Sequence, residues 1–163
     1  MMAVGPTGVG KSTLLNSLLC PAVRTTEYRD CHFTTGSGFA SVTKNISGVI
    51  APWLGNEVPG IQLAKVFDTQ GLGDTDGGDT DTLKAIVNNI NSEPVQAILL
   101  LFKATDRFSS EIQKQLRTLE FILGPQLWDH VITVYTFWGF SAHDIKVRVD
   151  NCMSDGGGQL EVL

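Results

Sequence analysis

Residues 5–12, with the sequence GPTGVGKS, match the pattern G-x-x-x-x-G-K-[ST] at every fixed position. Glycines at this spacing let the backbone wrap closely around an anion, so that N–H groups and the start of the next helix point at phosphate oxygens. Lys11 then reaches the β- and γ-phosphates, and the Ser12 hydroxyl ligates Mg²⁺. A plain glycine-rich turn needs no lysine before the serine. The segment predicts a phosphate-binding loop (P-loop) whose contacts come from Gly5, Thr7, Gly8, Val9, Gly10, Lys11, Ser12 and Thr13.

A second candidate segment, residues 67–71 (FDTQG), follows a strand-like run further along the chain. In nucleotide sites an acidic residue at a strand end holds Mg²⁺ through water, and a following glycine lets its N–H approach the γ-phosphate. The pattern D-x-x-G alone is ordinary turn chemistry. After a strand and beside a phosphate loop, it predicts that Asp68 joins Ser12 at the metal and that Gly71 contacts the γ-phosphate.

The elements that position these residues follow from hydrophobic periodicity. Apolar and β-branched runs predict strands at residues 1–4, 43–53, 61–68, 95–102 and 131–137. Helical spacing predicts helices at residues 12–19, 83–90, 110–123 and 143–152. Only turn residues separate the second and third strands, which favours an antiparallel pair. The alternation of the remaining elements predicts an α/β, three-layer sandwich with a mostly parallel sheet, one antiparallel edge strand and helices on both faces.

The helix at 110–123 has signals at both ends. Ser110-x-x-Gln113 is a capping-box pattern, which predicts Ser110 as the residue that caps the helix. Gly124-Pro125 is a stop signal, because proline does not continue a helix.

Composition excludes several classes of protein. Hydrophobic residues make up 42% of the chain and charged residues 18%, enough for a core and unlike a disordered segment. A net charge of -5 gives no long-range attraction for nucleic acid or anionic lipid, so we expect no nucleic-acid partner. Cys20, Cys31 and Cys152 are widely spaced and predict neither a disulfide framework nor a zinc site, so we expect a reduced, cytoplasmic protein. No signal-peptide pattern is visible and the longest apolar run, residues 95–102, is too short to cross a bilayer, so we expect no membrane anchor within these residues.

With both motifs in place, the chain resembles the P-loop GTPases, and within them the immune-associated, avirulence-induced (GIMAP/IAN) branch, with septins and chloroplast import GTPases as more distant relatives. Three stretches carry the resemblance: the opening GPTGVGKSTLLNSLL, residues 41–45 (SVTKN), and residues 106–111 (DRFSSE), which resemble a box that marks the branch. The resemblance runs from about residue 2 to residue 140.

The resemblance implies GTP or GDP with Mg²⁺ as the bound cofactor. Thr43 would give its hydroxyl to Mg²⁺ and its backbone to the γ-phosphate, and it would act with Lys11 and Gly71 in catalysis. Loops held by these contacts are released when the γ-phosphate is lost. The relatives also imply a homodimer or oligomer that forms through this switch face.

One departure concerns the guanine-reading motif [NT]-[KR]-x-D, expected after the last strand. The chain has TFWG at residues 136–139, so Thr136 fits while the basic residue and the aspartate are absent. Either Phe137 or Trp138 offers a ring that would stack on the base without distinguishing purines. Asp144 lies too far along the chain to substitute without a rearranged loop. Selectivity for GTP over ATP therefore rests on the family resemblance.

A second departure is Leu72, at the position where some GTPases carry a water-orienting glutamine. Because leucine cannot polarise water, we expect slow hydrolysis, with a missing group supplied by a partner such as a second copy. The sequence thus predicts a guanine-nucleotide-binding domain with slow Mg²⁺-dependent GTP hydrolysis, acting as a regulatory switch or an oligomerising scaffold. A non-hydrolysing interaction module and a non-selective NTPase or ATPase are the alternatives.

The expected domain covers residues 1–152 and is incomplete at both ends, followed by a flexible tail at 153–163. The GTPase plan has a further strand and a closing helix after the strand at 131–137. We therefore expect that strand to be an exposed sheet edge, which is a hazard for association.

Overall fold

The computed structural model describes residues 1–20, 31–35, 46–53, 63–72, 79–104 and 109–146. Thr43, with the whole 41–45 segment, lies outside the described residues. So do residues 106–108 of the branch-specific box, and the expected domain boundary at 152 with its tail at 153–163. These predictions stay predictions.

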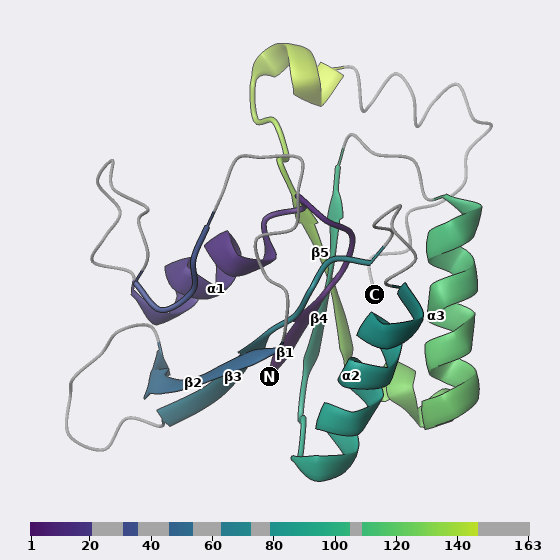
Figure 1. Ribbon diagram of the computed structural model, residues 1–163. Helices are drawn as coiled ribbons and strands as arrows, with labels where there is room; N and C mark the ends of the chain where they lie inside the picture. The colour runs from purple at the N-terminus through teal and green to yellow at the C-terminus, as the bar shows by residue number, and fades with distance from the viewer. Residues whose placement is uncertain (21–30, 36–45, 54–62, 73–78, 105–108, 147–163) are drawn as a thin grey trace.

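A five-stranded sheet with the order β2-β3-β1-β4-β5 forms the middle layer (Figure 1). Its strands are β1 (Met2–Val4), β2 (Ser47–Pro52), β3 (Leu63–Asp68), β4 (Ile98–Lys103) and β5 (Val131–Thr136). All neighbours pair in parallel except β2 and β3, which are antiparallel. The predicted α/β class and the antiparallel edge pair are confirmed, and β5 lies at the other edge among the described strands.

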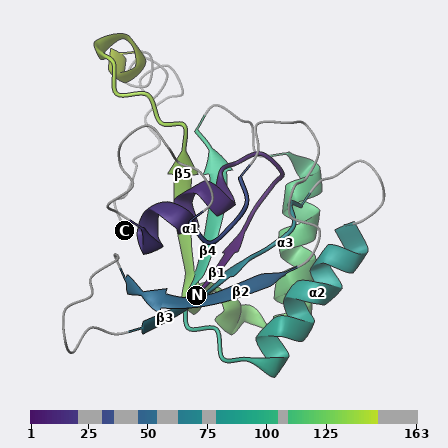
Figure 2. The same ribbon diagram turned by 60° about the vertical axis from the view of Figure 1, so that its left-hand side comes forward.

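Helices cover both faces of the sheet. These are α1 (Lys11–Leu19), α2 (Asp79–Ser92) and α3 (Ser110–Leu123). Figures 1 and 2 show α1 on one face, with α2 and α3 side by side on the other. A 3₁₀ helix, Pro125–His130, leads from α3 into β5, and residues 142–146 form a helical turn beyond the end of β5. Within the described segments, no helix has the length and apolar character to cross a bilayer.

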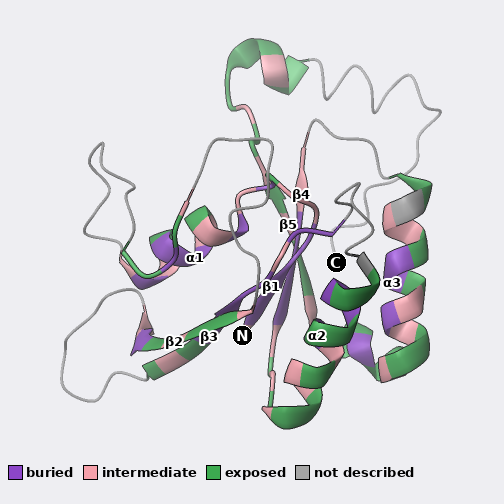
Figure 3. Cartoon of the chain, in the orientation of Figure 1, coloured by how far each residue is buried: buried purple, intermediate pink, exposed green. Residues whose placement is uncertain are grey.

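Two hydrophobic clusters hold the layers together. Figure 3 shows that the buried residues lie along the central strands and on the helix surfaces that face the sheet. Alternate residues of the central strands point to opposite faces, so Met2 and Val4 pack beneath α2 and α3 while Ala3 packs beneath α1. Strand β4 is buried over Ile98–Leu101, as expected of a strand covered on both sides. By contrast, β5 has exposed residues on both faces, among them Ile132 and Tyr135.

The N-cap of α3 differs from the sequence prediction. Ser109, in extended conformation, accepts a hydrogen bond from the Ile112 N–H at 3.3 Å. The prediction of Ser110 as the cap was wrong because Ser110 is already the first helical residue, and a capping residue keeps a non-helical backbone. Gly124 ends the helix with φ 85°, as the sequence predicted.

The end of α1 carries a disulfide between Cys20 and Cys31, whose Cα atoms lie 6.6 Å apart. The Asn16 side chain explains the approach, because it bonds the backbone N–H and C=O of Phe33 at 3.0 and 2.7 Å and the N–H of His32 at 3.2 Å. These bonds bring residues 31–33 back onto the end of the helix. The prediction that the cysteines are too widely spaced to pair was wrong for these two.

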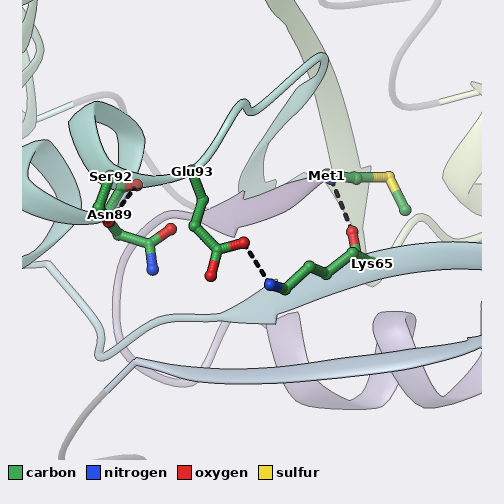
Figure 4. Close-up of polar contacts among 5 residues, drawn as sticks. All are labelled: Met1, Lys65, Asn89, Ser92 and Glu93. Carbon is green, nitrogen blue, oxygen red and sulfur yellow. Dashed lines mark hydrogen bonds and ion pairs between the residues drawn. The ribbon is translucent and has the colours of Figure 1, made fainter.

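Strand β3 is also linked to the end of α2 (Figure 4). Lys65 forms an ion pair with Glu93, and its carbonyl accepts a hydrogen bond of 2.9 Å from the Met1 amino group. Burial lowers the pKa of that amino group. In α2, the Ser92 hydroxyl donates to the Asn89 carbonyl at 3.1 Å. Both partners of the ion pair are more than a third exposed, so water screens their attraction.

Candidate nucleotide-binding site

The P-loop connects β1 to α1 at the carboxyl end of the parallel strands. Gly8 and Gly10 have left-handed φ values of 74° and 87°, which glycine adopts without steric cost. Gly10 is the N-cap of α1, and its carbonyl accepts the N–H of Leu14 at 2.9 Å. The loop therefore turns directly into a helix N-terminus, where backbone N–H groups and the helix dipole favour an anion.

Lys11 lies within this loop with only 7% of its surface exposed. Its ammonium group donates to the carbonyls of Gly5 at 3.1 Å and Pro6 at 3.0 Å. The ammonium group thus adds a positive charge beside the helix N-terminus, and both favour an anionic ligand in the loop.

Ser12 and Asp68 meet as the sequence predicted. The Ser12 hydroxyl donates to Asp68 Oδ2 at 2.6 Å, although the two residues are far apart in the chain. Parallel pairing of β1 with β3 sets Asp68 beside Ala3, just before the P-loop begins. Asp68 is 1% exposed. A hydroxyl and a carboxylate are the hard oxygen ligands that Mg²⁺ prefers, so this pair fits the metal.

Gly71 lies directly against the P-loop. A β-carbon on Gly71 would come within 2.5 Å of the Thr7 Cα and 2.6 Å of its nitrogen, so no side chain fits there. Backbone bonds on both sides fix the approach: Leu72 N–H to the Gly5 carbonyl at 3.0 Å, and Thr7 N–H to the Leu72 carbonyl at 3.3 Å. The Thr7 hydroxyl is buried and has no hydrogen-bond partner within the described part of the chain.

The side chain of Leu72 belongs to the core. It is 1% exposed and packs in the cluster under α2 and α3. Its backbone thus serves the P-loop while its side chain points into apolar surroundings, and it offers no group that could orient a water molecule.

At the opposite end of the P-loop, Thr136 ends β5. Its hydroxyl donates to the Val9 carbonyl at 2.7 Å and is 3.2 Å from the Phe102 carbonyl, so it ties β5 and β4 to the P-loop. The predicted site residue Thr136 is therefore brought to the loop, where it contacts the backbone.

The two aromatic residues after Thr136 point to different places. The Phe137 ring lies 4.0 Å from the position of a β-carbon on Gly10, and the Lys103 ammonium lies 5.4 Å from the centre of this ring. The ring of Trp138 lies beside that of Tyr135, with 6.1 Å between centroids. The sequence analysis offered both rings for stacking on a base. In the structure Phe137 lies beside the P-loop, whereas Trp138 lies beside Tyr135.

Asp144, which the sequence places too far along the chain to substitute without a rearranged loop, lies beside Gly139. Phe137 adopts a left-handed φ of 53°, and the chain then folds into the helical turn at 142–146. A β-carbon on Gly139 would come within 2.6 Å of the Asp144 Cγ. Gly139 occupies the motif position where the guanine-reading motif has an aspartate. The carboxyl group of Asp144 lies where a side chain of residue 139 would begin.

Comparisons with known proteins agree with this geometry. A sequence profile of the AIG1 family matches residues 1–154. Immune-associated nucleotide-binding protein 7 of Arabidopsis thaliana is 30% identical over 140 residues, covering 83% of this chain and 40% of that protein. Immune-associated nucleotide-binding protein 10 of the same plant is 30% identical over 138 residues, covering 83% of this chain and 27% of that protein. The chain thus spans less than half the length of these relatives.

Solved structures show the same fold at low identity. A structure of the chloroplast translocon components atToc33 and psToc159, for whose GTPase activity dimerisation is important, matches with a TM-score of 0.65 at 20% identity. It covers 98% of this chain and 61% of the other. Era of Aquifex aeolicus, bound to GDP and AlF4⁻, matches with a TM-score of 0.60 at 18% identity, covering 95% of this chain and 46% of the other. The match over residues 1–154, together with the sheet order, shows that this chain belongs to the AIG1 family and has the α/β fold of the P-loop GTPases.

Proposed function

We propose that this domain binds GTP with Mg²⁺ and hydrolyses it slowly. The observation that carries the proposal is the convergence of Lys11, Ser12, Asp68 and Gly71 on one loop. A phosphate chain in this loop would meet the helix N-terminus, a buried ammonium and the backbone of Gly71. The family relationship favours a guanine nucleotide as the ligand.

Each residue has a separate task in the proposed site. Lys11 would exchange its carbonyl partners for β- and γ-phosphate oxygens and neutralise charge that develops during phosphoryl transfer. Ser12 and Asp68 would hold Mg²⁺, which supplies further neutralisation of the phosphates when it is bound. Thr43 would complete this set from the switch segment.

Slow hydrolysis follows from the surroundings of Leu72. Its side chain is packed in the core and cannot position the attacking water, so hydrolysis would need a group from a partner. A second copy that docks on the switch face is the partner we propose, and the dimerisation of the translocon GTPases is a parallel in the same fold. In this proposal the domain works as a regulatory switch or oligomerising scaffold.

The same observation favours a second candidate, a module that binds nucleotide but does not turn it over. The two candidates differ in the hydrolysis rate at high protein concentration, where a dimer would form. Turnover that rises with protein concentration supports the GTPase, whereas binding without turnover supports the module.

The deciding experiment titrates fluorescent GTP and ATP analogues into the purified chain with Mg²⁺, beside the variant Lys11→Ala. Preferential binding of GTP that is lost in Lys11→Ala supports the proposal. Equal binding of both analogues would leave a non-selective NTPase. Absence of binding by a folded chain would refute the proposed function.

A further inference from the structure

The carboxyl group of Asp144 occupies the place where a side chain of residue 139 would start. A β-carbon built on Gly139 meets the Asp144 Cγ at 2.6 Å and its Cβ at 3.1 Å. The three nearest atoms to that position all belong to Asp144. Gly139 is the fourth residue of the TFWG segment, where the guanine-reading motif has its aspartate. The structure therefore fills this position with a carboxyl group from five residues further along the chain.

The carboxyl group is held in a defined orientation. The Ser141 hydroxyl donates to Asp144 Oδ2 and accepts the Asp144 N–H at 3.1 Å. The Ile145 N–H bonds the Ser141 carbonyl at 3.0 Å, which closes the helical turn. This reciprocal arrangement restricts the side chain and reduces the entropy that it loses when it accepts a ligand.

The first residue of the TFWG segment, Thr136, is hydrogen-bonded to the P-loop. The Thr136 hydroxyl bonds the Val9 carbonyl in the P-loop at 2.7 Å. Phe137 then places its ring beside Gly10, under the ammonium group of Lys103. The ring of Phe137 beside the P-loop and the carboxyl group beside Gly139 are the two kinds of group that contact a purine base, the ring on its face and the carboxyl group on its edge.

The chemistry of a carboxylate at this place distinguishes the purines. The outer edge of guanine presents two parallel donors, N1–H and the 2-amino group, and a carboxylate accepts both. Adenine presents an acceptor beside its 6-amino donor, so one contact would be repulsive. A neutral ring such as Phe137 stacks on either base and selects neither.

We propose that Asp144 is the residue that reads guanine in this domain, in place of the side chain that Gly139 lacks. This inference rests on the proposed function, because it assigns the base contact of the same nucleotide. The alternative is that Asp144 only caps the helical turn with Ser141.

The test uses the variant Asp144→Asn in the full chain. Fluorescent GTP bound with Mg²⁺ is displaced by unlabelled GTP, ATP and xanthosine triphosphate. Losing one charge-assisted, two-point contact lowers the affinity for GTP by about 10- to 100-fold and leaves ATP unchanged. Affinity for xanthosine triphosphate rises, because xanthine has a carbonyl where guanine has an amino group and the asparagine amide can donate to it.

A pair of variants moves the carboxylate back to the motif position. Asp144→Ala alone loses selectivity, and adding Gly139→Asp restores it. Gly139 does not have a left-handed φ, and Asp144 itself supplies the nearest atoms around its β-carbon position. The double variant therefore removes the carboxyl group that stands in the way and leaves only the Cβ of residue 144, 3.1 Å from that position.

The outcomes separate this inference from the proposed function. If the native chain binds no fluorescent GTP, the proposed function fails. If the native chain binds GTP and ATP equally, or prefers GTP as strongly in Asp144→Asn as before, nucleotide binding stands and the role of Asp144 is refuted. An equal loss of GTP and ATP in Asp144→Asn also refutes it, because a residue that only supports the fold would have that effect.

Discussion

At the phosphate end of the site, the contacts come from one short segment and the end of the neighbouring strand. Lys11 and Ser12 belong to the P-loop itself, and Asp68 reaches Ser12 through the pairing of β1 with β3. At the base end, Thr136 and Phe137 come from β5, and the carboxyl group of Asp144 returns from the helical turn beyond it. The phosphate end keeps the common pattern of its fold, while the base end departs from it.

In the proposed site, the difference reflects the parts of the nucleotide that each end would contact. Phosphate oxygens are bound mainly by backbone N–H groups and one cation. Binding them therefore requires one loop conformation and a lysine at position 11, and few other sequences would supply both. A base edge needs one carboxylate at one point in space, and different parts of the chain can supply it. Substitutions at the two ends should therefore change different quantities.

The largest effect is expected at the phosphate end, from Lys11→Ala. Loss of a charge-assisted contact to the phosphates costs about 3 kcal/mol, or about 100-fold in affinity. Because the contact does not involve the base, GTP and ATP should lose affinity by the same factor. Fluorescence titration measures both, with the surface variant Lys114→Ala as the control. A loss confined to GTP would show that the two ends are not separate.

Reduction of the disulfide between Cys20 and Cys31 should act on stability. The sequence separation of 11 residues corresponds to a loop whose closure contributes about 2–3 kcal/mol to the free energy of unfolding. Urea denaturation with and without dithiothreitol measures the difference, and Cys152→Ser serves as the control. An unchanged midpoint on reduction would mean that the two thiols are not joined in the purified protein.

Thr136→Val should lower nucleotide affinity by a smaller factor, because Thr136 connects the base end of the site to the P-loop. The substitution keeps the shape of the side chain and removes the hydrogen bond to the Val9 carbonyl. Its loss costs about 1 kcal/mol, or about five-fold in affinity, and it should affect GTP and ATP equally because the bond positions the P-loop. Thr133→Val, on an exposed position of the same strand, is the matched control. A change in the GTP to ATP ratio would instead place Thr136 at the base.

The smallest effect is expected away from both ends, from Lys65→Ala. The ion pair with Glu93 is well exposed, so its removal should change the free energy of unfolding by less than about 0.5 kcal/mol. Nucleotide affinity should not change. Chemical denaturation of Lys65→Ala, Glu93→Ala and the double variant measures the coupling, and a coupling above 1 kcal/mol would contradict this estimate.

The predicted site residues that the structure brings together are those whose neighbours are fixed by local sequence pattern. The P-loop glycines and Lys11 lie within one motif, and Asp68 reaches Ser12 because parallel strands place their carboxyl ends together. The position of Asp144 depends on the left-handed turn at Phe137, a conformation that no residue type there signals.

The disulfide was missed for a similar reason. It depends on the hydrogen bonds from Asn16 to the backbone of residues 32 and 33, and spacing along the chain does not reveal such long-range contacts. The cap of α3 was shifted by one residue because two serines stand side by side at its start. Backbone angles decide which residue is the N-cap, and the sequence pattern does not specify those angles, so an error of one residue at a helix end is common.

The two backbone bonds that join Leu72 to Gly5 and Thr7 carry the parallel pairing of β1 and β3 beyond the strands. The segment after Asp68 and the P-loop therefore behave mechanically as one piece, since neither can slide without breaking those bonds. Because β3 in turn pairs with β2, hydrogen bonds connect the P-loop through the sheet to the strand at its far edge among the described residues.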